Sequence, residues 1–243
     1  MTPDVPVTLA HVAADGWRIF DLAEANPNVL VPACPGWTLT DLAIHTSGIH
    51  RRVAHWVANR VSQMEPWPGG EPADPTNPFS WCREGLGLLL VALKAADPHA
   101  SVWSWTDRRN AGFYQRRMMH ENAIHRWDAE SAVGTPGPID ADLATDGVDE
   151  VLAVGMRFRA SGLPMEYPEG SLLLARTDGT DRWLVRSLDG TLQVARNGDA
   201  GGSANATVTG PAEDLLLYLW GRPSAAVIGE DTDVAAAWAQ VAP

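Results

Sequence analysis

The sequence predicts an α+β protein, with a four-helix bundle followed by a small α/β domain. Over the first two thirds of the chain, apolar residues recur at spacings of three and four, which is typical of helices that bury one face. After about residue 162 the pattern changes to short β-type runs separated by Asp-Gly dipeptides. The length of 243 residues and the hydrophobic content of 45% are sufficient for two packed domains.

The helices of the first part can be placed from their periodicity and their end signals. The Asn26-Pro27 pair ends the first helical pattern, and Thr38 with Asp41 has the spacing of an N-terminal capping box. The Gly- and Pro-rich stretch after residue 133 ends the fourth helical pattern, and a fifth helical segment follows it. The predicted helices cover about residues 9–23, 39–60, 79–96, 110–133 and 139–159.

The last third of the chain predicts a small mixed domain. The turn-forming pairs Asp178-Gly179 and Asp189-Gly190 separate β-type runs, as hairpin turns do. The change from helical periodicity to short β-type runs places the domain boundary at residue 160. This gives a helical domain at 1–160 and an α+β domain at 161–243. Strands are expected at 171–176, 183–187, 192–196 and 204–208, a short apolar run at 225–228, and helices at 211–220 and 234–241.

Charge and cysteine content exclude several classes of protein. The net charge of −12 argues against nucleic acid and anionic membranes as partners, because both require a cationic surface. Two cysteines without a Cys-x-x-Cys motif do not form a disulfide scaffold. The N-terminal residues lack a basic segment followed by an apolar run, and no apolar run is long enough to span a membrane. We therefore expect a cytoplasmic monomer that acts on small molecules.

Residues 117–128 hold the richest set of chemical groups. Glu121 and His125 lie about 40° apart on a helix, so both side chains can reach one divalent ion. His45 and His50 flank the apolar face of the helix at 39–60, and periodicity favours neither as a third ligand. An ordinary interpretation also fits this segment, because a polar stripe is often a solvated face and Arg117 with Glu121 has the spacing of a surface ion pair.

Two segments, PGWTLTDLAIH at 35–45 and MMHENAIHRWDAE at 118–130, carry a family resemblance. Together they resemble the mycothiol-dependent maleylpyruvate isomerase family, which belongs to the DinB-like metal-binding four-helix bundles. The segment LLLYLWGR at 215–222 is similar to the small, sterol-carrier-like C-terminal domain of that family. The resemblance implies a DinB-like bundle at 1–160, metal ligands at His45, Glu121 and His125, and a functionally important arginine at Arg222.

The same resemblance implies a reaction. The expected cofactors are Zn²⁺, or another divalent metal, and mycothiol, a low-molecular-weight thiol. A metal lowers the pKa of a bound thiol, and the metal-bound thiolate then adds to an electrophilic small-molecule substrate. Reversible addition to a cis-enedione allows rotation and returns the trans isomer, whereas release of the adduct makes the protein a thiol S-transferase. Arg222 would bind a substrate carboxylate, and the alternative for it is a contact with the last carbonyls of its helix.

The sequence also allows two functions other than a thiol-using enzyme. The alternatives are a non-catalytic metal- or small-ligand-binding protein and a zinc-dependent hydrolase.

Three other residues give further expectations. Asp128 lies one turn from His125, where it either orients that ring or is an exposed acid. Cys34 precedes the Pro-Gly-Trp turn and is expected as a small buried apolar group. The chain has one lysine, Lys94, and this arginine-rich composition is typical of an actinobacterial source.

Overall fold

The computed structural model describes residues 4–66, 68–158 and 165–242. The chain forms two compact units, residues 2–138 and 139–243. The boundary expected at residue 160 lies outside the described residues, and the units divide earlier, because the fifth helix belongs to the C-terminal unit. Its helical periodicity made it resemble the bundle in sequence, but it packs against a later helix.

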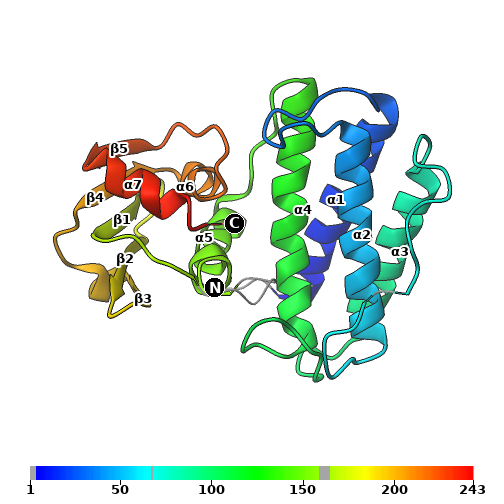
Figure 1. Cartoon of the computed structure of the whole chain (residues 1–243), viewed down its shortest axis with the longest axis horizontal. Helices are drawn as coiled ribbons and strands as arrows, with labels where there is room; N and C mark the ends of the chain where they lie inside the picture. Colours follow the sequence, from blue (N-terminus) through cyan, green and yellow to red (C-terminus); the bar gives the residue numbers. More distant parts are fainter. Residues whose placement is uncertain (1–3, 67, 159–164, 243) are drawn as a thin grey trace. The chain divides into compact units, whose positions relative to one another are not determined.

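The N-terminal unit is the predicted four-helix bundle (Figure 1). Its helices lie side by side, with α1 packed mainly against α4 and α2 mainly against α3. The four helices are α1 (Val5–Ala25), α2 (Leu39–Ala58), α3 (Phe79–Ala95) and α4 (Ala111–Val133). Each corresponds to a helix that the sequence predicted. Among the described residues, no helix has the length and apolar character needed to cross a membrane.

The start of α2 is fixed by local hydrogen bonds. The Asp41 backbone N–H donates to Thr38 Oγ1 at 3.2 Å, and the Thr38 N–H donates to Asp41 Oδ2 at 2.8 Å. This is the predicted capping box, and it satisfies two backbone donors at the helix end. The turn before it is closed by a bond from the Val31 N–H to the Trp37 carbonyl at 2.9 Å. Together these bonds set the rotation of α2 and hence the direction of its side chains.

One buried amide joins three helices of the bundle. Asn122 of α4 donates from Nδ2 to the Val12 carbonyl of α1 at 2.9 Å. Its Oδ1 atom accepts a hydrogen bond from His50 Nε2 of α2 at 2.8 Å. Asn122 and His50 are both fully buried, so neither group can exchange its partner for water.

The C-terminal unit contains one mixed sheet and three helices (Figure 1). The strand order is β3-β2-β1-β4-β5, in which β1 and β4 are parallel and all other pairs are antiparallel. The strands are β1 (Ser171–Arg176), β2 (Arg182–Leu188), β3 (Thr191–Arg196), β4 (Ala206–Gly210) and β5 (Val227–Glu230). The helices are α5 (Ala141–Glu150), which continues as a π-turn over Val151–Gly155, α6 (Ala212–Leu219) and α7 (Thr232–Ala239), and a 3-10 turn covers Asn197–Ala200.

The turn chemistry and burial of the sheet follow the sequence. Asp189 and Gly190 adopt φ angles of 49° and 71°, the left-handed conformation of a tight turn between β2 and β3. Leu173 and Leu184 pair across β1 and β2 and pack with Ala200 of the 3-10 turn. Leu174 points to the opposite face and is also fully buried, so the central strand is covered on both sides.

The first prediction concerns the buried amide. Asn122→Ala leaves the His50 Nε2–H without a partner in a dry core, which costs about 1–3 kcal/mol, and removes the second hydrogen bond of the Val12 carbonyl, which keeps its bond within α1. We expect the free energy of unfolding to fall by about 2–4 kcal/mol in urea denaturation. Asn59→Ala, at the exposed end of α2, is the control and should change it by less than about 1 kcal/mol. Equal effects of the two substitutions would contradict the role of Asn122.

Candidate metal centre

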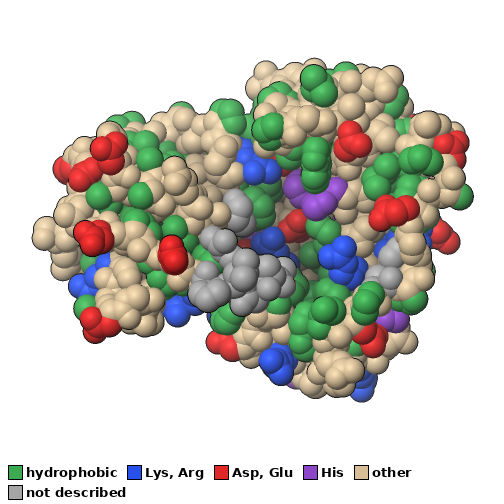
Figure 2. All heavy atoms as spheres, in the orientation of Figure 1, with side chains coloured by type: hydrophobic (Ala, Val, Ile, Leu, Met, Phe, Trp, Pro, Cys, Tyr) green, Lys and Arg blue, Asp and Glu red, His purple; other side chains and the backbone are tan. Residues whose placement is uncertain are grey.

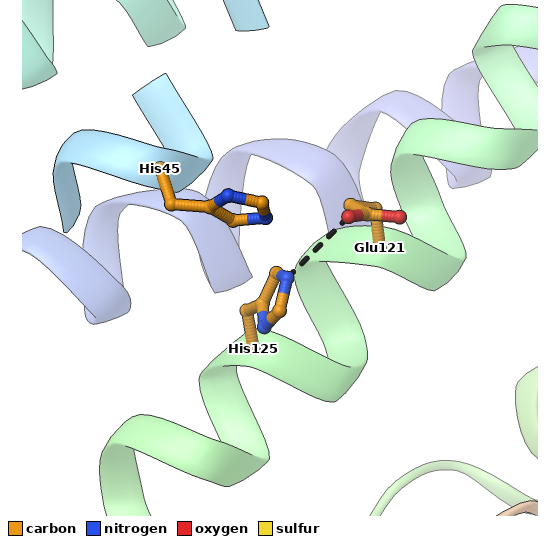
Figure 3. Close-up of side chains that lie close together, drawn as sticks. All are labelled: His45, Glu121 and His125. Carbon is orange, nitrogen blue, oxygen red and sulfur yellow. Dashed lines mark ion pairs between the residues drawn. The ribbon is translucent and has the colours of Figure 1, made fainter. Parts of the chain in front are cut away.

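Three side chains of the bundle converge on one point. His45 comes from α2, and Glu121 and His125 lie one turn apart on α4 (Figure 3). One nitrogen or oxygen atom of each lies within 4.8 Å of the others, and the two rings and the carboxylate point toward one another. Among the described residues, this is the only group of three or more His, Cys, Asp or Glu side chains arranged so that they could hold a metal ion.

Glu121 is a buried carboxylate held from two sides. Its Oε2 atom accepts a hydrogen bond from Arg117 Nη2 at 2.6 Å, and its Oε1 atom lies 3.4 Å from His125 Nε2. Burial opposes the ionisation of Glu121, but the adjacent Arg117 and His125 hold the pKa of its carboxyl well below the ordinary value. The carboxylate is therefore charged at neutral pH. The polar stripe of α4 is buried here, not a solvated face.

His125 is oriented by the acid that follows it on α4. Its Nδ1 atom lies 3.1 Å from Oδ2 of Asp128, whose side chain is fully buried. Burial disfavours the imidazolium form, but the Asp128 and Glu121 carboxylates outweigh it and raise the pKa of His125 to about 9. Because Nδ1–H donates to Asp128, Nε2 is the atom that faces Glu121. Carboxylate–histidine pairs of this kind orient metal-binding imidazoles.

His45 forms the exposed side of the group. The Trp37 ring packs on one side of it at 4.8 Å between centroids, and the His125 ring lies 5.4 Å away at 88°. Protein atoms that remove water from part of the ring lower the pKa of His45, and the nearby His125 lowers it further. His45 is therefore neutral at pH 7, which is the form that binds metals.

The structure separates the two histidines that periodicity left equivalent. His50 lies in the core and not in the group, with its Nε2–H donated to Asn122 at 2.8 Å. Burial lowers the pKa of His50 to about 4, so its imidazole is neutral over the physiological range. His50 is thus a structural histidine of the bundle, and His45 is the one that meets α4.

Cys34 makes a contact that the sequence reasoning missed. It is half-buried, and its thiol donates to Asp128 Oδ2 at 3.8 Å, the oxygen that also accepts from His125. The expectation of a small buried apolar group did not include this bond. The sequence did hold a signal for this contact, namely the position of Cys34 just before the Pro-Gly-Trp turn. That turn brings the loop close to Asp128, which follows His125 on α4.

Arg222 lies in the C-terminal unit, immediately after α6. Its Nη1 atom donates to the Trp220 carbonyl at 2.7 Å, and its guanidinium lies over the Trp220 ring at 5.6 Å. The first contact is the one expected from an arginine that satisfies the last carbonyls of a helix. A substrate-binding role for Arg222 remains a prediction.

The donor set suits a zinc ion. Two imidazole nitrogens and one carboxylate oxygen are common zinc ligands, and three protein ligands leave a coordination position for a substrate or cofactor, as in catalytic sites. The Asp128 contact, the Arg117 contact and the neutral His45 ring prepare the three groups for a cation. The cluster therefore fits the metal that the sequence resemblance implies.

Comparisons with known proteins agree with this architecture. Residues 9–130 match the model of the mycothiol maleylpyruvate isomerase N-terminal domain, and residues 142–240 match that of the C-terminal domain of the same family. Two crystal structures of a mycothiol-dependent maleylpyruvate isomerase, one of a histidine-to-alanine mutant, share the fold with TM-scores of 0.64 and 0.61. Both are 16% identical in sequence, with 93% of each chain covered. No curated protein sequence matches the chain. The chain belongs to the mycothiol maleylpyruvate isomerase family.

Proposed function

We propose that the protein is a zinc- and mycothiol-dependent enzyme that adds the mycothiol thiolate to an electrophilic small molecule. The observation that carries this proposal is the convergence of His45, Glu121 and His125 within 4.8 Å. Family membership supports the thiol, and the two structural relatives are a mycothiol-dependent isomerase and its mutant. The product, a trans isomer or a released thiol adduct, distinguishes an isomerase from an S-transferase.

His45, Glu121 and His125 would hold the zinc ion. When bound there, zinc would lower the pKa of a coordinating thiol so that the thiolate exists at neutral pH. The chain contributes the arrangement of the ligands. Asp128 fixes the orientation of His125, Arg117 fixes that of Glu121, and Trp37 covers one side of the His45 ring.

A hydrolase is less consistent with these contacts. Zinc hydrolases of the HExxH type use a carboxylate that takes a proton from water near the metal. Asp128, the acid considered for that role, is fully buried and accepts from both His125 and Cys34. Its oxygen is therefore engaged in orienting the ligand.

The ligand assignment predicts the metal content of variants. His45→Ala, Glu121→Ala and His125→Ala each remove one of three ligands, so each should reduce zinc from about one equivalent to a small fraction after dialysis. His11, a half-buried histidine of α1 outside the group, is the matched control, and His11→Ala should keep full zinc. Metal analysis by mass spectrometry measures this. Full zinc content in all three ligand variants would show that the assignment is wrong.

The pKa of His125 predicts the pH dependence of zinc binding. Since that pKa is about 9 without metal, zinc must displace a proton at neutral pH, and its affinity should rise with pH until about 9. The folding stability of the metal-free protein has the opposite pH dependence. The raised pKa of His125 contributes stability at low pH, and this contribution is lost as the pH rises from about 6.5 to about 9. Calorimetry in buffers of different ionisation enthalpy should show about one proton released near pH 7.

The same measurement tests the orienting acid. Asp128→Asn keeps the size of the side chain but removes the charge that favours His125, so zinc affinity should fall about 10- to 100-fold. Proton release near pH 7 should fall as well. Unchanged affinity together with unchanged proton release would contradict the role assigned to Asp128.

The proposal for Arg222 predicts a loss of activity without a loss of metal. Arg222→Ala should keep about one equivalent of zinc but lower kcat/KM for a carboxylate-bearing electrophile about 10- to 100-fold, because a charged hydrogen bond contributes about 1.5–3 kcal/mol. Steady-state assays with mycothiol measure the change, and Arg186→Ala, at an exposed arginine of β2, is the control. Unchanged turnover in Arg222→Ala would assign the arginine to its helix-end contact alone.

A further inference from the structure

A strip of α2 extends from the metal centre along the surface of the bundle. His45, Gly48 and Arg52 follow one another at spacings of three and four, so they share one side of the helix. His45 and Arg52 are exposed, and Gly48 between them is half-buried. On the face drawn in Figure 2, basic side chains lie close to a histidine side chain. The strip is therefore accessible from solvent and begins at a proposed zinc ligand.

Gly48 leaves open space in the middle of the strip. A Cβ atom placed at this position would meet no protein atom within 4 Å. Glycine inside an exposed helix costs about 1 kcal/mol relative to alanine, and packing gives no reason for it here. By contrast, a Cβ atom on Gly85 of α3 would overlap with Ser47 and Arg51, so that glycine is explained by the close contact of two helices. The space above Gly48 is available to a ligand instead.

Arg52 places a positive charge at the end of the strip that is farthest from His45. Among the described residues, no acid or hydrogen-bond acceptor pairs with its side chain, whereas the adjacent Arg51 is buried and bonded to the Trp81 carbonyl and to Glu84. The Cα–Cβ bonds of a helix tilt toward its N-terminus, and Gly48 and His45 lie on that side of Arg52. Its charge also lowers the pKa of His45, which agrees with this direction.

The length and charge of the strip indicate its ligand. His45 and Arg52 are seven positions apart on the helix, which is about 10 Å along the axis. We propose that the electrophilic substrate lies over Gly48 with its reactive carbon near His45, and that Arg52 binds a carboxylate at its other end. This inference rests on the proposed function and adds to it a specificity-determining residue, Arg52, which selects electrophiles whose carboxylate lies several bonds from the reactive carbon.

The test compares an acid with its ester. 6-Maleimidohexanoate carries an activated alkene and, at the end of a flexible alkyl chain, one carboxylate, and its methyl ester carries the same alkene without the charge. With mycothiol and the zinc-loaded protein, we expect a higher kcat/KM for the acid than for the ester. Arg52→Gln should reduce this preference about 10-fold or more, and Arg52→Lys should retain part of it. Arg109→Gln, at an exposed arginine of a loop, is the control and should keep the full preference.

A second variant tests the open space without touching a charge. Gly48→Leu should lower kcat/KM for both compounds at least about 10-fold, while zinc content stays at about one equivalent and the melting temperature does not fall. Gly87 of α3 is a matched control, because it is also half-buried and a Cβ atom there would have no neighbour within 4 Å. Gly87→Leu should leave kcat/KM unchanged.

The outcomes separate this inference from the proposed function. If the wild-type protein adds mycothiol to neither compound, the proposed function fails and the strip loses its role with it. If the wild type uses acid and ester equally, or if Arg52→Gln keeps the preference, the role of Arg52 is overturned while the thiol chemistry stands. If Gly48→Leu is as active as the wild type, the substrate does not lie over Gly48.

Discussion

The burial of charge on one face of α4 is the constraint on which the rest of the helical unit depends. Arg117, Glu121, His125 and Asp128 lie on one stripe, and the last three are among the buried residues. Isolated charges at such positions would cost several kcal/mol each, so they persist because each has an opposite partner within the same helix. The stripe therefore forms an ordered polar surface inside the bundle, in which two acids balance two cations, and a divalent cation bound there would replace the proton of His125.

The second helix brings the third side chain of the cluster, His45, to this stripe. The capping box at Thr38 fixes where α2 begins, and the turn before it places Trp37 against His45. The same helix carries His50 into the core, where it bonds to Asn122 and burial keeps it neutral. Two histidines on one helix thus have different surroundings, because the rotation of α2 directs one to the candidate metal centre and the other between three helices.

Much of the fold was predictable because its signals are local. Helical periodicity, the Thr38 cap and the Asp189-Gly190 turn each determine backbone conformation over a few residues. The strand order was not predicted, because the parallel pairing of β1 with β4 depends on contacts far apart in sequence. The extent of the C-terminal unit was predicted too small for the same reason, since α5 is defined by its packing against α6 and not by its sequence pattern.

The candidate site was predictable in part. The spacing of Glu121 and His125 brings them together on any helix, but the choice between His45 and His50 needed the family resemblance, because both flank the apolar face equally. The burial of Asp128 and its bond to Cys34 depend on the loop that precedes α2. Because Asp128 is charged, hydropathy alone predicts that it is exposed. The folded structure shows that its side chain is buried and accepts hydrogen bonds from Cys34 and His125.

We propose that His45, Glu121 and His125 hold a zinc ion with one position open to a thiol. Zinc K-edge X-ray absorption of the purified protein, recorded before and after addition of mycothiol, reports the atoms bound to the ion in both states. We expect only nitrogen and oxygen neighbours at about 2.0–2.1 Å at first, and then one sulfur neighbour at about 2.3 Å. Sulfur ligands before mycothiol is added, or no sulfur neighbour after saturation with it, would show that the proposed site is wrong.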